Sequence, residues 1–287
     1  MSEQVITRLG VVGAGTMGTA LATLAVGRGL PVVLVDVDDA VLDRARRDVT
    51  QQLRLAQLMG RLPRTADVGE LVTATSVDAL ADADAVIEAV TELPEVKAKV
   101  LAEVSAAVRP GTLLVTNTSA IPVDEQADWT ARPEELVGIH FMNPPYLIRT
   151  VEVIHGPRTG QAAKDRTDAL LAVLDCEGVL VGDGPGFVIN RILQRMINEA
   201  ARIVEEGRAT PEAVDAVFQG CLGHRTGPLA TADLIGLDNV VDSLRVLRER
   251  TGDLGYEPCD LLVAKVAAGD HGRKTGRGFY EHGEAQS

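Results

Sequence analysis

The chain has 287 residues, of which 46% are apolar and 24% are charged. This length is enough for a well-buried core and too great for one small module, so we expect two domains. The net charge of −13 argues against general nucleic-acid binding, which needs a basic surface.

Hydropathy and the N-terminus show no membrane or export segment. No stretch reaches the roughly eighteen uncharged apolar residues that a membrane helix needs, and Met1-Ser2-Glu3-Gln4 does not open a signal peptide. We therefore expect a cytoplasmic protein. Cys176, Cys221 and Cys259 are odd in number and widely spaced. This pattern fits neither a disulfide framework nor a zinc site, so we expect reduced core residues and no metal site.

The first part of the chain alternates short β-branched runs with longer segments of helical periodicity. This alternation predicts an α/β domain with a parallel, doubly wound sheet of the Rossmann type. The expected strands are Leu9 to Val12, Val32 to Val35, Leu71 to Thr75, Ala85 to Val90, Leu113 to Thr116, Val137 to His140, Val151 to Ile154 and Val179 to Val181.

A cluster of helix and strand breakers, Gly182-Asp183-Gly184-Pro185-Gly186, follows the last of these strands. Since neither kind of element can continue through it, we place the domain boundary there and expect domains at 1–184 and 185–287. The second domain shows helical periodicity and almost no strand alternation, which predicts an all-α domain. Its expected helices are Phe187 to Glu206, Pro211 to Leu222, Asp238 to Thr251 and Cys259 to Ala268.

A glycine motif, Gly13-Ala14-Gly15-Thr16-Met17-Gly18, comes directly after the first expected strand and opens a helix. In that context the glycines allow a tight turn, close approach of a pyrophosphate and close helix packing. Asp36 ends the second strand, where its carboxylate would accept hydrogen bonds from the adenine ribose. Asp38 and Asp39 would repel a 2′-phosphate, so NAD is favoured over NADP. The alternatives are a turn that binds no ligand and an FAD site.

His140 and Glu152 form a candidate catalytic pair. Imidazole changes charge near neutral pH, and a carboxylate within the apolar run Val151 to Ile154 needs a partner. A buried structural histidine and a glutamate on the exposed face of a strand are the alternatives.

Several motifs, in order and over nearly the whole chain, resemble those of the 3-hydroxyacyl-CoA dehydrogenases. They include the glycine motif, Asn117-Thr118-Ser119, His140 to Pro144, Glu152, Gly186-Phe187-Val188-Ile189-Asn190-Arg191, Gly227-Pro228, Asp233, Gly236-Leu237-Asp238 and the run from Gly272 to Tyr280.

The resemblance implies NAD-dependent oxidation of a 3-hydroxyacyl thioester. His140 would take the hydroxyl proton, and Glu152 would hold the other ring nitrogen. Ser119 would contact the substrate hydroxyl and the nicotinamide side, although it could also be a helix N-cap. Asn190 would hydrogen-bond a substrate oxygen, or it is an ordinary surface residue.

Four further residues, Glu92, Lys97, Asn143 and Lys274, match positions that in this family contact the nicotinamide ribose. For Glu92 and Lys97 the alternative is a solvated helix start.

The departures from the family pattern concern the substrate carrier. Gln52 and Met59 stand where the family usually offers a serine and a lysine to coenzyme A. Six arginines nevertheless lie between Arg44 and Arg64, against Asp48 alone. This local excess would suit coenzyme A or an acidic acyl carrier protein, unless it is simply a solvated helix face. The segment Pro145 to Thr150 also differs, which would alter the lining for the acyl chain.

Three hypotheses follow. The first is a dehydrogenase of short 3-hydroxyacyl thioesters on coenzyme A, such as 3-hydroxybutyryl-CoA, and the second is the same chemistry on an acyl carrier protein in polyketide extender-unit biosynthesis. The third is an NAD-binding structural protein without turnover. The helical domain is expected to form a homodimer.

Overall fold

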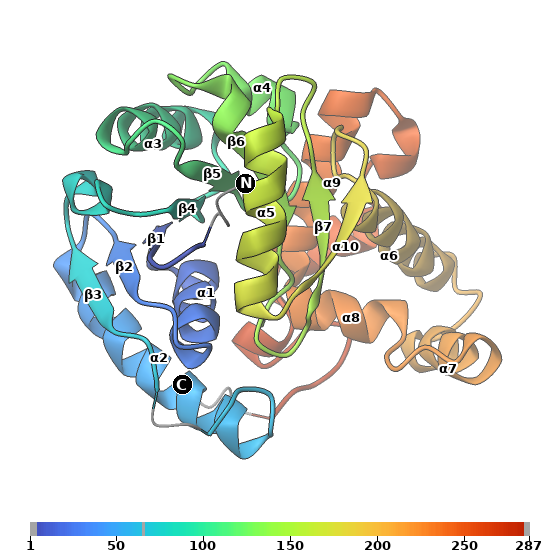
Figure 1. Ribbon diagram of the computed structural model, residues 1–287. Helices are drawn as coiled ribbons and strands as arrows, with labels where there is room; N and C mark the ends of the chain where they lie inside the picture. Colours follow the sequence, from blue (N-terminus) through green and yellow to red (C-terminus); the bar gives the residue numbers. More distant parts are fainter. Residues whose placement is uncertain (1–4, 65–66, 284–287) are drawn as a thin grey trace. The chain divides into compact units, whose positions relative to one another are not determined.

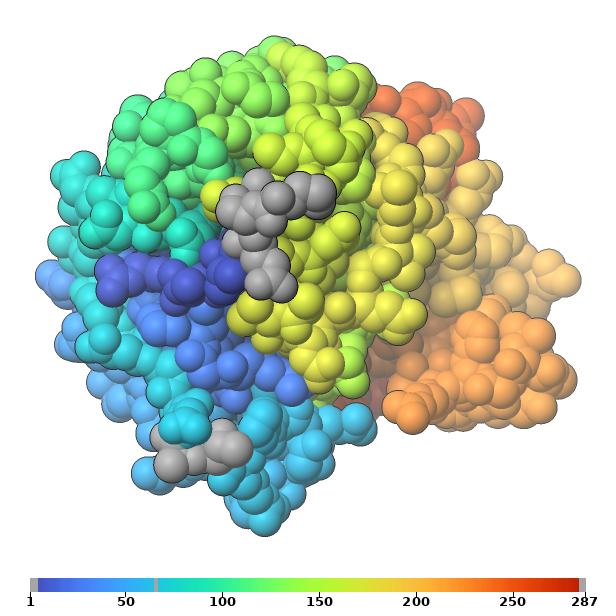
Figure 2. All heavy atoms as spheres, in the orientation of Figure 1, coloured from blue at the N-terminus to red at the C-terminus, as the bar shows by residue number. Residues whose placement is uncertain are grey.

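The computed structural model describes residues 5–64 and 67–283. The chain divides into two compact units, the first ending at Gly184 and the second beginning at Pro185. Figures 1 and 2 show the chain as a ribbon and as a space-filling view, coloured along the sequence. In the first unit, helix α5 (Gln161–Leu174) lies on the face turned toward the viewer.

The first unit is built on one eight-stranded sheet with the order β3-β2-β1-β4-β5-β6-β7-β8. This order, in which β1 lies between β2 and β4 and is parallel to both, confirms the Rossmann-type α/β fold. The strands are β1 (Leu9–Val12), β2 (Val32–Val35), β3 (Leu71–Ala74), β4 (Ala85–Glu88), β5 (Leu113–Thr116), β6 (Leu136–His140), β7 (Thr150–Ile154) and β8 (Glu177–Val181).

The expectation of a wholly parallel sheet is wrong at two strands, because β7 runs antiparallel to β6 and β8 runs parallel to β7. The connection between β6 and β7, residues 141–149, is too short for the helical crossover that a parallel pair needs. The antiparallel register makes His140 and Glu152 direct cross-strand partners. Two residues that the sequence separates are therefore brought side by side on one face of the sheet.

Helices pack on this sheet because inner strands such as β1 and β2 carry no polar side chain and are fully buried. The apolar core joins strand residues such as Leu9 and Leu113 to helix residues such as Leu24 and Leu170. The helical segments are α1 (Thr16–Gly27), α2 (Asp39–Leu58), η1 (Val77–Leu80), α3 (Pro94–Ala107), α4 (Val123–Ala127), η2 (Pro133–Glu135) and α5.

The second unit is helical, as expected, and within its described residues, 185–283, there is no regular strand. Apart from helix ends shifted by one residue, two features differ from the expectation. The first helix starts at Ile189 because Phe187 has a φ of +47°, outside the helical region. A short helix beginning at Pro228 was not predicted. The elements are α6 (Ile189–Glu205), α7 (Pro211–Leu222), α8 (Pro228–Ile235), α9 (Leu237–Thr251), η3 (Leu254–Tyr256), α10 (Asp260–Ala267) and η4 (Arg273–Thr275).

Asp233 of α8 fastens the C-terminal segment to the helical core. Its buried carboxylate accepts hydrogen bonds from the backbone amides of Phe279, at 2.8 Å, and Tyr280, at 2.9 Å. These charge-assisted bonds satisfy a carboxylate that would otherwise be costly to bury.

The three cysteines are all free, but they are not all in the core. Cys259 is buried and Cys176 is partly buried, whereas Cys221 is exposed, so the expectation of a core position is wrong for Cys221. Among the residues that the structure describes, no helix is long and apolar enough to cross a membrane, and no cluster of His, Cys, Asp and Glu side chains could hold a metal ion.

Candidate active site

The glycine motif forms the turn between β1 and α1, and its three glycines meet different surroundings. A Cβ on Gly18 would lie 1.7 Å from the carbonyl oxygen of Gly13, so only glycine lets α1 start this close to the strand. Gly13 itself has a φ of +97°. A Cβ on Gly15 would meet no atom within 4 Å. The backbone at Gly15 is therefore open to a ligand, at the positive end of the α1 dipole.

A cavity of about 800 Å³ begins at Gly13 and Gly15 and continues past Asp36 to the ends of β3 and β4. This volume is in the range of small-molecule and cofactor sites. The Asp36 carboxylate accepts hydrogen bonds from the backbone amides of Ala14, at 2.8 Å, and Asp38, at 3.2 Å. Asp36 and Asp78 line the cavity together with Glu103, and its lining includes no Lys or Arg. A 2′-phosphate would therefore find no cation there.

His140 ends β6, and its imidazole contacts side chains on both of its nitrogens. Nδ1 lies 2.7 Å from Glu152 Oε2, and Nε2 lies 3.2 Å from Ser119 Oγ. The His140 and Glu152 side chains are each 5% exposed. Because a carboxylate can only accept, the Nδ1 proton is donated to Glu152, which leaves Nε2 of the neutral ring as a proton acceptor. Since the Glu152 side chain is buried, the alternative of a glutamate on an exposed strand face is wrong.

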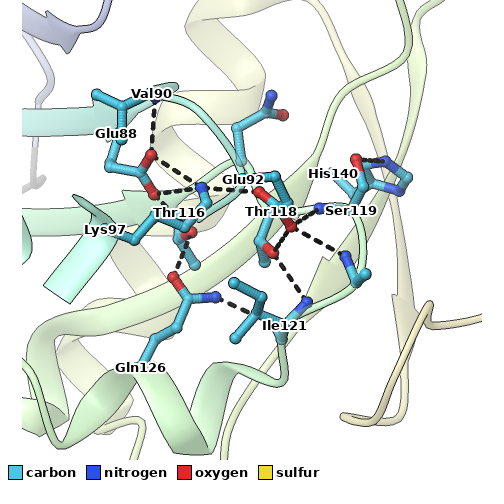
Figure 3. Close-up of polar contacts among 12 residues, drawn as sticks. Glu88, Val90, Glu92, Lys97, Thr116, Thr118, Ser119, Ile121, Gln126 and His140 are labelled. Carbon is cyan, nitrogen blue, oxygen red and sulfur yellow. Dashed lines mark hydrogen bonds and ion pairs between the residues drawn. The ribbon is translucent and has the colours of Figure 1, made fainter. Parts of the chain in front are cut away.

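Ser119 lies in the turn that follows β5, at the carboxyl edge of the sheet, where open α/β sheets bind their ligands. The alternative of a helix N-cap is wrong, because α4 begins at Val123 and its N-cap is Pro122, without a side-chain cap. The turn is held by Glu92, whose Oε1 accepts hydrogen bonds from Ser119 N at 2.9 Å and from the Thr118 hydroxyl. Figure 3 shows this glutamate beside the turn.

Lys97 is fully buried, so the alternative of a solvated helix start is wrong for it. Its Nζ lies 2.9 Å from both carboxylate oxygens of Glu88 and 3.0 Å from Glu92 Oε2. Burial alone would lower the pKa of Lys97, but the two carboxylates hold it above its usual value. Burial likewise raises the pKa of Glu92, yet the Lys97 ammonium and the Thr118 hydroxyl bring it below its usual value.

The remaining sequence-predicted residues lie elsewhere. Asn143 is exposed in the segment after β6. Two residues belong to the second unit: Asn190 is in the first turn of α6, and Lys274 is in η4, where its Nζ lies 2.5 Å from Asp238 Oδ2. Their roles at the site stay predictions.

Sequence reasoning missed Glu88, Thr116 and Gln126, which lie behind the Ser119 turn. Glu88 could have pointed to this group in the sequence, because it is an ionisable residue that ends the otherwise apolar strand β4. A charge at that place in a fully buried strand requires a partner, and Lys97 is that partner.

An open glycine turn, an acid at the end of β2 and a histidine oriented by a buried glutamate together define an NAD-dependent dehydrogenase. The sequence matches the family models of the 3-hydroxyacyl-CoA dehydrogenase NAD binding domain, over residues 8–184, and C-terminal domain, over residues 186–282. The chain therefore belongs to the 3-hydroxyacyl-CoA dehydrogenase family, and NAD is its cofactor.

Relatives of known name support this assignment. The chain is 40% identical to the 3-hydroxybutyryl-CoA dehydrogenase of Bradyrhizobium diazoefficiens over 97% of this chain and 96% of that protein. Its fold is similar to the crystal structure of M. tuberculosis FadB2, with a TM-score of 0.92, 35% identity and coverage of 96% and 99% of the two chains. For (S)-3-hydroxybutyryl-CoA dehydrogenase PaaH1 from Ralstonia eutropha, the TM-score is 0.88, the identity 37% and the coverage 97% and 100%.

Proposed function

We propose that this chain oxidises a short 3-hydroxyacyl thioester, with 3-hydroxybutyryl-CoA as the representative substrate, to the 3-oxoacyl thioester. The observation that carries the proposal is the arrangement around His140, with a carboxylate 2.7 Å from Nδ1 and a hydroxyl 3.2 Å from Nε2. This arrangement provides a base for an alcohol proton. The relatives named for 3-hydroxybutyryl-CoA support a short acyl chain.

In this proposal Nε2 of His140 takes the proton of the substrate hydroxyl, and Glu152 stabilises the imidazolium that forms. NAD, when bound at the glycine motif, would supply the acceptor for the hydride that leaves the substrate carbon. The Ser119 hydroxyl donates to the substrate oxygen, which directs that oxygen toward Nε2. Asn190 would supply a further hydrogen bond to the substrate.

The cofactor-binding residues in this proposal fall into two groups. The backbone of the glycine motif would bind the pyrophosphate, and Asp36 the adenine ribose. Glu92, Lys97, Asn143 and Lys274 are proposed to serve the nicotinamide side, Lys97 by the indirect route described below.

A groove on α2 supports the binding of an anionic carrier. It is lined by Arg46, Arg47, Thr50, Gln51, Arg54, Leu55 and Leu58, a set with three arginines and no carboxylate. Coenzyme A, with its phosphates, is the first candidate. An acyl carrier protein with an acidic face is the second, since the same groove would attract it. Gln52 is tied to α1, because its Oε1 accepts a hydrogen bond from the Thr23 hydroxyl at 3.1 Å.

The test compares NADH production from one 3-hydroxybutyryl group presented on coenzyme A and on acyl carrier protein. We expect turnover on coenzyme A. In His140→Ala, turnover should fall by at least about 100-fold, because general base catalysis is lost, while NADH affinity stays near that of the wild type. No NADH from either thioester, or turnover of His140→Ala equal to that of the wild type, contradicts the proposal. A strong preference for the carrier protein favours the second candidate.

We also propose a homodimer formed through the second unit. Its support is the number of large apolar side chains exposed there, among them Ile192 at 63% and Leu222 at 63%. Exposed apolar groups of this kind are typical of association surfaces. Sedimentation should give the mass of a dimer, and a compact monomer at micromolar concentration would contradict this.

A further inference from the structure

We infer that Glu88 and Lys97 are positioning residues, which hold Glu92 against the Ser119 turn and thereby set the Ser119 hydroxyl at the His140 imidazole. The inference rests on the proposed function, since it concerns the geometry of the same reaction. It assigns a role to Glu88 and gives Lys97 an indirect one.

The first step is the fixing of Lys97 by Glu88. An ammonium group has three N–H donors, and here its Nζ is within 3.0 Å of three carboxylate oxygens, two from Glu88 and one from Glu92. The Lys97 side chain is 1% exposed. Glu88 is itself fixed, because its Oε1 also accepts from the backbone amide of Val90 at 2.8 Å. The Lys97 ammonium is thus held between the Glu88 and Glu92 carboxylates, as Figure 3 shows.

The second step leads from Lys97 to the turn. Oε2 of Glu92 forms an ion pair with Lys97 Nζ, and Oε1 of Glu92 accepts hydrogen bonds from the turn. Besides the Thr118 hydroxyl and Ser119 N, this Oε1 accepts from Ala120 N at 3.2 Å. Three successive residues of the turn therefore depend on the place of one carboxylate, and Ser119 is the middle one.

A second arm of the same network holds the other end of the turn. Thr116 Oγ1 lies 2.9 Å from Glu88 Oε2 and 2.8 Å from Gln126 Oε1. The Gln126 amide nitrogen donates to the backbone oxygen of Ile121 at 3.0 Å. Both arms start at Glu88 and end on the residues around Ser119, which is why we assign positioning rather than general stabilisation to this network.

Charge explains why Lys97 is needed. Glu92 is 35% exposed at its side chain, whereas Glu88 is 1% exposed as a residue. Without the ammonium, two carboxylates would face each other in a site largely shielded from water, and the one with access to solvent would move outward. Glu92 would then leave the turn, and Ser119 would lose its restraint.

The experiment uses Lys97→Met and the double variant Lys97→Met with Glu88→Gln. The single variant leaves two unbalanced carboxylates and is expected to lose stability. The double variant has the same net charge in the network as the wild type, so its stability should largely return. Its kcat should nevertheless remain about 10- to 100-fold below that of the wild type, because a displaced catalytic group costs rate even in a folded protein. KM for the thioester should change much less. The affinity for NADH should fall together with kcat, because the displaced Glu92 is also proposed to serve the nicotinamide side.

Two further measurements separate positioning from structure. Exchange of the Ser119 and Ala120 amide protons should be at least about tenfold faster in the double variant, because their acceptor has moved. Ser105→Ala is the matched control. Ser105 is buried on the same helix, α3, and its hydroxyl contacts Ala102 O and Ala131 N instead of the turn. This variant should lose some stability while it keeps kcat and the exchange rates.

A double variant with the kcat of the wild type overturns the inference, as does unchanged amide exchange. A loss confined to NADH affinity also overturns it, because Lys97 would then act on the cofactor directly. These results are distinct from a failure of the proposed function, in which the wild type oxidises no 3-hydroxyacyl thioester. Amide exchange tests the network without any turnover.

Discussion

Replacing Glu152 by Gln tests the link between the buried carboxylate and the chemistry of His140. The substitution keeps nearly the same shape and removes only the charge. Glu152 Oε2 is 2.7 Å from Nδ1, and both side chains are 5% exposed, so water contributes little screening to this pair. As His140 takes up the substrate proton, the ring becomes charged, and the wild-type hydrogen bond becomes one between two ions.

The expected magnitude follows from this change. A hydrogen bond to a charged partner contributes about 1.5 to 3 kcal/mol, and one between neutral groups about 0.5 to 1.5 kcal/mol. The lost difference of about 1 to 2 kcal/mol corresponds to a fall in kcat/KM of about 5- to 30-fold, since 1.4 kcal/mol is tenfold in rate. A larger fall is expected where the new amide donates to Nδ1, because this would place the ring proton on Nε2.

The assay is the rate of NADH formation from 3-hydroxybutyryl-CoA, with NADH binding measured in parallel. Glu177→Gln is the matched control, because Glu177 is an exposed glutamate on the neighbouring strand β8, and it should behave like the wild type. If Glu152→Gln retains kcat/KM within about twofold of the wild type, which is below the smallest loss estimated from the hydrogen bond, the carboxylate does not stabilise the charged ring.

Three further predictions concern the cofactor site and the pH dependence of stability. Asp36→Ala should raise the KM for NAD by about tenfold or more, because a charged acceptor is lost, and should leave that for NADP nearly unchanged; equal effects on both would contradict the assignment. Gly15→Ala should leave the free energy of unfolding unchanged and weaken NADH binding, whereas Gly18→Ala should lower the free energy of unfolding because its Cβ would meet a backbone oxygen. Denaturant titrations measure the first quantity and NADH titrations the second. A destabilised Gly15→Ala, or a Gly18→Ala as stable as the wild type, would contradict these roles. The pKa of Glu92 is held below its usual 4.5 in the folded chain. Its contribution to stability is therefore present above that pH and is lost as the pH falls through the lowered value; the free energy of unfolding of Glu92→Gln should depend less on pH in that range, and identical dependences would refute this.

The parallel strands and the cofactor turn could be predicted from sequence because their signals are local. A run such as Val32–Val35 is buried on both faces and is therefore apolar throughout. The glycines at 13 and 18 reflect backbone constraints that no other residue meets. The short helix at Pro228 gave no such signal, because eight residues are too few for a clear apolar period.

The buried network could not be predicted because its parts are joined only by the fold. Lys97 lies in the first turn of a helix that starts at a proline, a position that is usually solvated, and nothing local marks it as fully buried. Its partner Glu88 is nine residues away, at the end of a strand. Thr116 and Gln126, which support Glu88, come from two further elements. Such a set becomes visible only once β4, β5, α3 and α4 are placed together.

The pairing of His140 with Glu152 shows how topology converts a sequence pattern into chemistry. Alternation in Thr150–Ile154 puts Glu152 on the face opposite Val151 and Val153, which by itself suggests an exposed side chain. In this sheet both faces are covered, and all three residues are buried. A parallel β7 with its first residues aligned to those of β6 would set Glu152 opposite Gly138, two residues and about 6 to 7 Å along the strand from His140. The antiparallel register removes this offset. The reversed strand is therefore what allows one carboxylate to orient the base, and the short 141–149 connection is what forces the reversal.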